Sequence, residues 1–238
     1  MKLIRYSHHQ LTRTGILDPD SGEISPQPGR APVADLAEVM LLAPCEPRVI
    51  VCAGRNYGSW GKLRKPRLFL KAANAVTGPG TPIRRPHGLR RLEYEGELAV
   101  VIGRTASQIN RRHYRDYILG YTCANDITAD DWRTDGQWVR AKSADTFCPL
   151  GPWIETGIDD PAKLHLRTRV NGHTVQDSPT AAMLFGVDEL LAYITRWITL
   201  HPGDVLLTGS PDGVGPLTTG DRVDIDIDGI GVLTNTVH

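Results

Sequence analysis

Carboxylates that alternate along the chain are the clearest chemical signal in the sequence. Glu93, Glu95 and Glu97 are spaced two residues apart, and the apolar run 98–102 follows them directly. Because successive side chains of a strand point to opposite faces, these glutamates are predicted to share one face at the start of a buried strand, with neighbouring Cα atoms roughly 6.6 Å apart. Carboxylates this close raise each other's pKa unless a cation compensates them. Asp126 follows a second apolar run and is placed to complete the set.

An oxygen-only set of side chains indicates a hard divalent cation. No His or Cys lies near these acids in the sequence, so Mg2+ is the first expectation, with Mn2+ or Ca2+ as alternatives. Lys142 lies in a short polar segment before Phe147 and suits an anionic substrate. Two alternatives stay open, in which the acids are half-exposed residues of an edge strand and Lys142 is only their salt-bridge partner.

The composition argues against several classes of function. The 238 residues carry 27 basic and 27 acidic side chains, and neither half of the chain has a basic field that would suit nucleic acid or a membrane surface. We expect no signal peptide at the N-terminus and no membrane-spanning helix. The cysteines show no paired spacing, so we expect reduced, mostly buried thiols in a cytoplasmic protein; they are Cys45, Cys52, Cys123 and Cys148.

Local patterns predict a mostly β fold of the α+β class. Residues 1–30 read as a small β unit, 26–32 as a linker, and 33–42 as a helix because their apolar residues recur at helical spacing. We therefore expect a small N-terminal domain with its linker over residues 1–47 and the main domain over 48–238.

The main domain is predicted to contain many short strands and few helices. Strands are expected over 49–54, 67–71 and 205–208, a hairpin at Asn171-Gly172, and helices over 110–119 and 187–198. In the last predicted strand Val223, Ile225 and Ile227 alternate with three aspartates. We interpret those aspartates as the solvated face of a half-buried strand and not as a second metal cluster.

Eight short blocks, in order, resemble the fumarylacetoacetate hydrolase family. The resemblance covers roughly residues 48–238, and the N-terminal region resembles the small leading domain of that family. The blocks are Gly54-Arg55-Asn56-Tyr57, Phe69-Leu70-Lys71, Tyr94-Glu95-Gly96-Glu97-Leu98, Ala124-Asn125-Asp126, Ala141-Lys142-Ser143, residues 148–153, Val170-Asn171-Gly172 and residues 202–211. The isomerase, decarboxylase and acylpyruvase branch, which acts on 2-hydroxyhepta-2,4-diene-1,7-dioate and similar acids, is the most similar.

The resemblance implies a mixed β-roll catalytic domain, a homodimer, and a Mg2+ or Mn2+ ion held by Glu95, Glu97 and Asp126 beside a catalytic Lys142. It implies a small-molecule substrate with a 2-oxo acid or 1,3-dicarbonyl unit. A loop of hydroxyl and backbone donors would bind the substrate carboxylate, and residues of the first block would contact the substrate. These candidates are Thr208, Gly209 and Ser210 in the loop, and Arg55 and Tyr57 in the block.

The sequence departs from the family pattern at four positions. Hydrolytic members carry a His and, three residues later, a Glu on a short lid, where this chain has Trp60 and Leu63. Neither side chain can take a proton at neutral pH. Asp130 and Arg133 stand where the family commonly has Arg and Gln. They are predicted either to contact the substrate or to form a surface ion-pair cluster.

We therefore expect an enzyme that decarboxylates or isomerises a 2-oxo acid through a cation-stabilised enolate, because neither reaction needs an activated water. Hydrolysis of a C–C bond in an acylpyruvate-like substrate is the first alternative. A non-catalytic metal-binding scaffold and a secondary-metabolite tailoring enzyme are the others.

Overall fold

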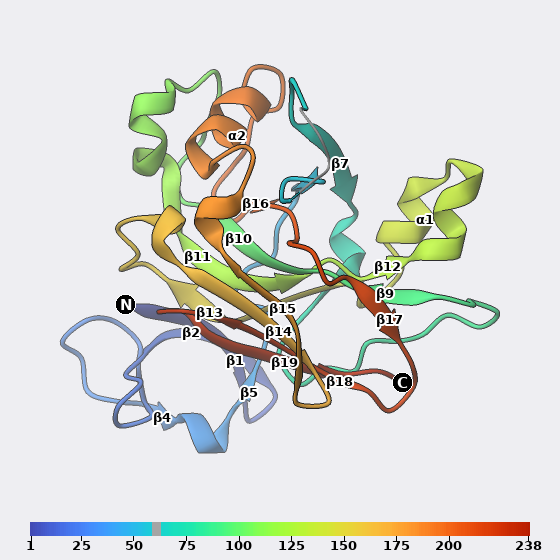
Figure 1. Cartoon of the computed structure of the whole chain (residues 1–238). Coiled ribbons are helices and arrows are strands. Elements are labelled where there is room, and N and C mark those ends of the chain that lie inside the picture. Colours follow the sequence, from blue (N-terminus) through green and yellow to red (C-terminus); the bar gives the residue numbers. More distant parts are fainter. Residues whose placement is uncertain (59–62) are drawn as a thin grey trace.

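One large, mostly antiparallel sheet organises the molecule (Figure 1). The computed structural model describes residues 1–58 and 63–238. In sheet order the strands are β4 (Ala34–Asp35), β3 (Glu23–Ser25), β2 (Leu11–Leu17), β1 (Lys2–His8), β13 (Cys148–Glu155), β11 (Ile118–Asn125), β10 (Gly96–Ile102), β16 (Val205–Leu207), β6 (Ile50–Gly54) and β7 (Arg67–Lys71). Two short strands join off this path, β5 (Met40–Leu41) on β1 and β8 (Val76–Thr77) on β13.

Two smaller sheets and a few short helices complete the described fold. One sheet orders β12 (Thr128–Ala129), β9 (Leu92–Tyr94) and β17 (Gly215–Leu217). The other orders β15 (His173–Pro179), β14 (His165–Val170), β18 (Arg222–Ile227) and β19 (Gly231–Thr236). The α-helices are α1 (Trp138–Lys142) and α2 (Val187–Ile194); the 3-10 turns are η1 (Leu36–Glu38), η2 (Ala73–Ala75), η3 (Arg111–Tyr117), η4 (Asp130–Asp135), η5 (Pro161–Lys163) and η6 (Thr180–Ala182). The mostly β, α+β prediction is confirmed.

The centre of the large sheet is the most protected part of the molecule. All seven residues of β10 are buried, because β11 and β16 pair with its two edges and neighbouring elements cover its faces. In Figure 1, α2 lies at the top of the view and α1 at the right, so both short helices lie outside the central strands β11, β10 and β16. None of the described helices is long and apolar enough to cross a membrane.

The sequence predicted that the alternating acids lie on one continuous strand, and this prediction is wrong. β9 ends at Tyr94 in the small sheet and β10 begins at Gly96 in the large one, so the chain changes sheets at Glu95. The Glu95 N–H donates to Asn125 Oδ1 at 3.0 Å, and its carbonyl accepts from the Asp126 N–H at 2.8 Å. This switch aims Glu95 and Glu97 at one cavity and sends Glu93 towards the arginines of the neighbouring segments.

The N-terminal β unit is confirmed, but the predicted helix over 33–42 is wrong. Residues 33–42 hold only β4, the three-residue turn η1 and β5. Ala34 pairs with Ile24 and Leu41 with Tyr6, so strand pairing sets the path of this segment, while Val33 and Met40 stay exposed. Asp35 Oδ1 caps the 3-10 turn by accepting from the Ala37 N–H at 2.8 Å.

The N-terminal strands form their own small apolar cluster and also join the large sheet. Ile4, Tyr6, Leu17 and Ile24 are its buried members, and Trp153 of β13 packs against them. β1 pairs antiparallel with β13 through Leu3 and Ile154. A domain boundary after residue 47 remains our proposal.

Two predicted helices are shorter or tighter than expected. Over 110–119 the chain forms the 3-10 helix η3, and Leu119 belongs to β11. α2 ends at Ile194 and not at residue 198. Just after this end, the Thr195 hydroxyl donates to the Leu191 carbonyl at 2.8 Å. Trp197 therefore lies outside the helix and is 58% exposed.

Local turn and strand signals in the second half are confirmed. Asn171 and Gly172 have φ angles of 51° and 81°, which suits the tight hairpin between β14 and β15. On β18, Val223, Ile225 and Ile227 are buried while the aspartates between them reach the surface. All four cysteines are buried and free.

Candidate functional site

A cavity of about 610 Å³ lies where the two kinds of sheet meet. Its wall is formed by the end of β6, by Phe69 in the middle of β7, by residues 93–97, by η4 and α1, and by the loop 210–214. Glu93, Glu95, Glu97 and Lys142 all line it. The cavity therefore brings together residues that lie more than 100 positions apart in the chain.

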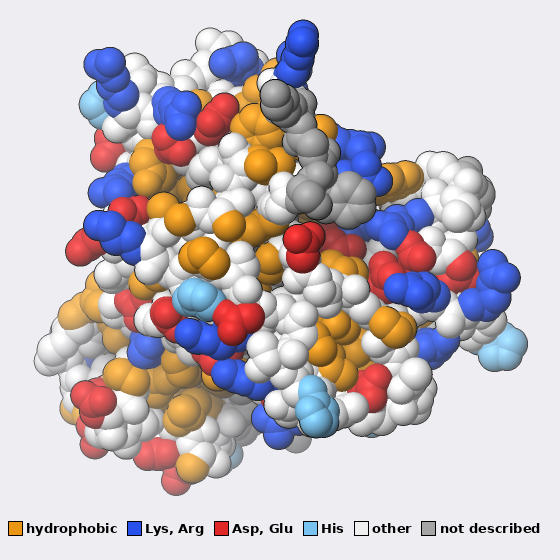
Figure 2. Space-filling model, viewed as in Figure 1, with side chains coloured by type: hydrophobic (Ala, Val, Ile, Leu, Met, Phe, Trp, Pro, Cys, Tyr) orange, Lys and Arg blue, Asp and Glu red, His pale blue; other side chains and the backbone are white. Residues whose placement is uncertain are grey.

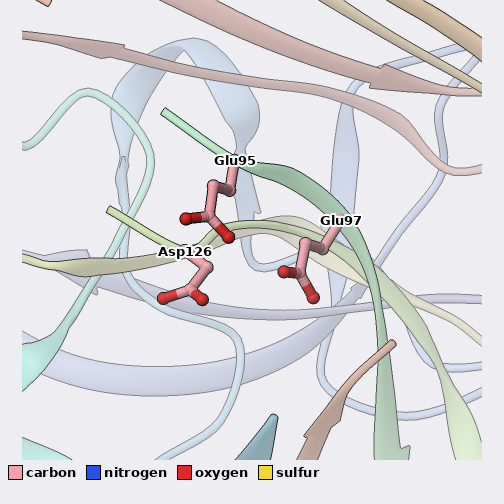
Figure 3. Close-up of side chains that lie close together, drawn as sticks. All are labelled: Glu95, Glu97 and Asp126. Atoms are coloured by element: carbon pink, nitrogen blue, oxygen red, sulfur yellow. The ribbon is translucent and has the colours of Figure 1, made fainter. Parts of the chain in front are cut away.

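Glu95, Glu97 and Asp126 form one carboxylate cluster, as the sequence predicted. One oxygen of each side chain lies within 4.8 Å of the others, and Figure 3 shows the three carboxylates converging. The cluster forms because β10 and β11 pair with Gly96 opposite Asn125, which places the end of β11 beside the start of β10. Glu97 and Asp126 are buried, and Glu95 is half-buried.

Two buried lysines compensate this cluster in part. Lys142 Nζ lies 2.6 Å from Asp126 Oδ2 and 2.9 Å from Glu95 Oε1, at the last residue of α1. Lys71 Nζ lies 2.5 Å from Asp126 Oδ1 and donates to the Ile127 carbonyl at 3.1 Å. Sequence reasoning missed Lys71, which lies behind the cavity wall; its signal is that it shares one strand face with Phe69, two residues earlier, and Phe69 lines the cavity.

The three carboxyl groups of the cluster have pKa values shifted in different directions. Burial raises the pKa of Glu97 well above its usual range, and the nearby Asp126 and Glu95 raise it further. Burial also raises the pKa of Glu95. Burial acts in the same direction on Asp126, but the charges of Lys142 and Lys71 outweigh it and leave the pKa of Asp126 lowered.

Lys142 is buried, yet the acids around it keep its ammonium group protonated. Burial does lower the pKa of Lys142, but the charges of Asp126 and Glu95 act in the opposite direction and prevail, so the pKa lies above its ordinary value. The ammonium is thus a fixed positive charge beside the acids. Two ammonium groups cannot neutralise three ionised carboxylates, and an oxygen-only donor set fits a hard divalent cation.

The three residues of the predicted carboxylate-binding loop, Thr208, Gly209 and Ser210, each contact a different partner within the protein. The Thr208 hydroxyl is buried and donates to the Leu98 carbonyl at 2.9 Å. The Gly209 N–H donates to Glu97 Oε2 at 2.6 Å. Ser210 lines the cavity and its hydroxyl accepts from Gln176 Nε2 at 2.8 Å. Of these three, only Ser210 reaches the cavity wall.

Of the two substrate-binding candidates in the first block, Arg55 and Tyr57, only Arg55 reaches the cavity. Arg55 lines the cavity and has a left-handed backbone with φ 58°. Tyr57 is fully buried behind the wall, and its hydroxyl has no hydrogen-bond partner among residues 1–58 and 63–238. Burial, followed by the charge of Glu97, raises the pKa of Tyr57, so the phenol stays protonated.

Asp130 and Arg133 both line the cavity and are also ion-paired with each other. Arg91 Nε lies 2.6 Å from Glu93 Oε1 and 3.6 Å from Asp130 Oδ2, so Glu93 pairs with a nearby arginine. These residues form a charge-balanced rim, and Figure 2 shows basic and acidic side chains interleaved at the right of the view. Both sequence interpretations of Asp130 and Arg133 are therefore compatible with their position.

The lid positions are only partly described. Leu63 is half-buried and packs against the main core, whereas Trp60 lies outside the described residues. Leu63 stands where hydrolytic members of the resembled family carry an acid, and it supplies no proton acceptor.

Comparisons with known proteins agree with this architecture. The mitochondrial oxaloacetate tautomerase fahd2 of Xenopus laevis is 40% identical over 220 residues, which cover 84% of this chain and 69% of that protein. The crystal structure of 5-carboxymethyl-2-hydroxymuconate delta-isomerase from Mycobacterium smegmatis aligns over 100% of this chain and 98% of its own, with 41% identity and a TM-score of 0.93.

A hydrolase is also among the structural relatives. The maleylpyruvate hydrolase of Sphingobium sp. SYK-6, solved with manganese(II) and pyruvate, aligns over 100% of this chain and 98% of its own, with 30% identity and a TM-score of 0.85. The sequence profile described as "Fumarylacetoacetate (FAA) hydrolase C-terminal" matches residues 49–238. The chain therefore belongs to the fumarylacetoacetate hydrolase family, and its relatives include isomerases, tautomerases and hydrolases.

Proposed function

We propose that the chain is a divalent-metal-dependent enzyme that isomerises or decarboxylates a 2-oxo acid. The observation that carries the proposal is the buried cluster of Glu95, Glu97 and Asp126, whose oxygens lie within 4.8 Å of one another on a cavity that also contains Lys142. The relatedness to an oxaloacetate tautomerase and to a muconate isomerase supports keto–enol chemistry.

In this proposal Glu95, Glu97 and Asp126 hold Mg2+, with Mn2+ or Ca2+ as alternatives. When bound, the cation supplies a Lewis acid that stabilises negative charge on the keto oxygen of the substrate. Lys142 contributes a fixed positive charge that orients the substrate carboxylate. Ser210 and Arg55 line the same cavity and contact the remainder of the substrate.

Arg133 and Asp130 would act at the rim of the cavity. Because they are paired with each other, and Arg133 Nη2 also lies 3.7 Å from Glu93 Oε2, little net charge is offered to a distal group of the substrate. Tyr57, Thr208 and Gly209 would support the wall from behind. Thr208 and Gly209 do so through their hydrogen bonds to Leu98 and Glu97.

Hydrolysis of a C–C bond is the second candidate, favoured by the kinship with a maleylpyruvate hydrolase. It requires a group that activates water, and Leu63 cannot provide one. A non-catalytic scaffold is the third candidate. Two fully buried lysine–carboxylate contacts weigh against it, because burying such charges is costly and a scaffold gains nothing from them.

The test is an ultraviolet assay on oxaloacetate, an acylpyruvate and a 2-hydroxy-diene dioate, with and without EDTA, and with products identified by mass. We expect a tautomer shift or CO2 loss that EDTA, Glu95→Ala and Lys142→Ala each abolish or reduce by about 10²–10³-fold, the cost of losing one charge-stabilising group. Asp226→Asn is the matched control, because Asp226 pairs with Arg169 away from the cavity. Cleavage of the acyl carbon bond would establish the hydrolase instead. No turnover of any substrate, with the cation still bound, would favour the non-catalytic scaffold.

We also propose a cytoplasmic homodimer. Light scattering on the purified chain should then give about twice the 26.2 kDa of one protomer, and a monomer mass would contradict it.

A further inference from the structure

Within the described part of the chain, one carboxylate of the cavity wall has no partner. Glu93 pairs with Arg91, Glu95 with Lys142, Glu97 accepts from the Gly209 N–H, and Asp130 pairs with Arg133. Asp212 also lines the cavity, and within residues 1–58 and 63–238 no side chain or backbone group is hydrogen-bonded or ion-paired to its carboxylate. An acid left available in a cavity whose other acids are engaged is suited to accept a proton.

The backbone on both sides of Asp212 is fixed by buried side chains. The Pro211 carbonyl accepts from Gln176 Nε2 at 2.8 Å, and the Gly213 carbonyl accepts from the Tyr94 hydroxyl at 2.7 Å. Gly213 has φ 101°, and a Cβ there would lie 2.0 Å from the Val175 carbonyl oxygen, so the turn packs tightly against β15. Asp212 is therefore an exposed carboxylate on an immobilised turn.

The carboxylate itself lies against Gly58, the residue that follows the first block of the family pattern. A Cβ built on Gly58 would lie 2.8 Å from Asp212 Oδ2, so the carboxylate packs directly on the Gly58 backbone. This position is on the cavity wall and open to solvent, which lets the group exchange its proton with water.

We propose that Asp212 is the catalytic proton acceptor of this chain, in place of the lid residues that the sequence lacks. The inference rests on the proposed keto–enol function. Asp212 takes the proton from carbon 3 of the 2-oxo acid, the C–H electron pair becomes the C2–C3 double bond, and the carbonyl π pair moves onto the oxygen. Water protonates that oxygen and Asp212 returns its proton to water, so the net change is isomerisation from keto to enol.

The test follows exchange of the carbon-3 protons of oxaloacetate into D2O by proton NMR. Asp212→Asn should slow exchange by about 10²–10⁴-fold, the usual contribution of a general base, with KM and Mn2+ affinity unchanged. Added formate or acetate should restore exchange to Asp212→Ala. Asp228→Asn is the matched control, because this acid pairs with Arg167 on the surface.

Three outcomes would overturn the assignment: exchange in Asp212→Asn at the wild-type rate, no rescue of Asp212→Ala by small carboxylates, or a loss of Mn2+ affinity that accounts for the whole defect. Circular dichroism of each variant ensures that the comparison is made between folded proteins. A wild-type protein inert towards all three substrates would instead overturn the proposed function.

Discussion

Glu97 is the residue on which the cation hypothesis can be tested most directly. Its single described hydrogen bond comes from the Gly209 N–H, and it is 2% exposed. Burial, Asp126 and Glu95 all raise its pKa, so without a cation the protonated acid is favoured in the fold. Because the folded pKa exceeds the unfolded one, ionisation of Glu97 destabilises the cation-free protein as pH rises above the ordinary glutamate range.

Cation binding should therefore release a proton and strengthen as pH rises. We expect calorimetric titration with Mn2+, in two buffers of different ionisation enthalpy, to show net proton release near neutral pH. The stabilisation that Mn2+ provides against thermal unfolding should shrink on acidification. Glu97→Gln is the control, since it keeps the side-chain size but has no proton to release. Equal proton release by this variant would contradict the assignment of Glu97.

At the scale of elements, β15 acts as the support that holds two walls of the cavity in register. Gln176 is buried on this strand; its Oε1 accepts from the Gly96 N–H at 3.0 Å, between the two glutamates. Its Nε2 donates to the Ser210 hydroxyl and to the Pro211 carbonyl, both at 2.8 Å. One amide thus connects the start of β10 to the loop 210–214.

Gln176→Leu should lower the free energy of unfolding by about 1–3 kcal/mol, because it leaves buried groups such as the Gly96 N–H without a partner. It should also weaken Mn2+ binding, since Glu95 and Glu97 flank Gly96. Urea denaturation and calorimetry measure the two effects. Thr174→Ala, an exposed position on the same strand, is the matched control and should change neither. Unaltered Mn2+ affinity in Gln176→Leu would show that β15 supports the fold alone.

At the scale of the whole molecule, the candidate site and the N-terminal unit are separate in the chain but share a sheet. All residues that line the cavity fall within 53–214, inside the proposed main domain. β1 nevertheless covers an edge of β13, which pairs with β11, the strand that leads into Asp126. The N-terminal unit thus reaches the carboxylate cluster through only two intervening strands.

Removal of residues 1–47 should lower the midpoint of thermal unfolding and promote aggregation. The truncation leaves β13 without β1 and exposes apolar surface around Trp153, and an uncovered strand edge is a template for association. Differential scanning calorimetry and light scattering measure both effects. A truncated chain that stays monodisperse and equally stable would show that the large sheet does not need the N-terminal unit.

The sequence alone determined the features that depend on near neighbours. The alternation of β18, the Asn171-Gly172 hairpin and the buried central strands follow from side-chain period and turn chemistry, which need no partner elsewhere. The carboxylate cluster was also predictable, because one apolar run begins with acids, the next ends at one, and consecutive strands commonly pair. The helix prediction for residues 33–42 was wrong for the converse reason. The helical spacing of its apolar residues is weak, and strand pairing with Tyr6 and Ile24 decided its structure.

Only the tertiary structure decided how the cavity is completed. The change of sheet at Glu95 depends on the Asn125 side chain, thirty residues away. The contact of Lys71 with Asp126, and the support of Asp212 through Gln176 and Tyr94, join segments between 35 and 119 residues apart. No local pattern encodes such contacts, because they arise from strand order and from the need to pair buried polar groups once the sheets have packed.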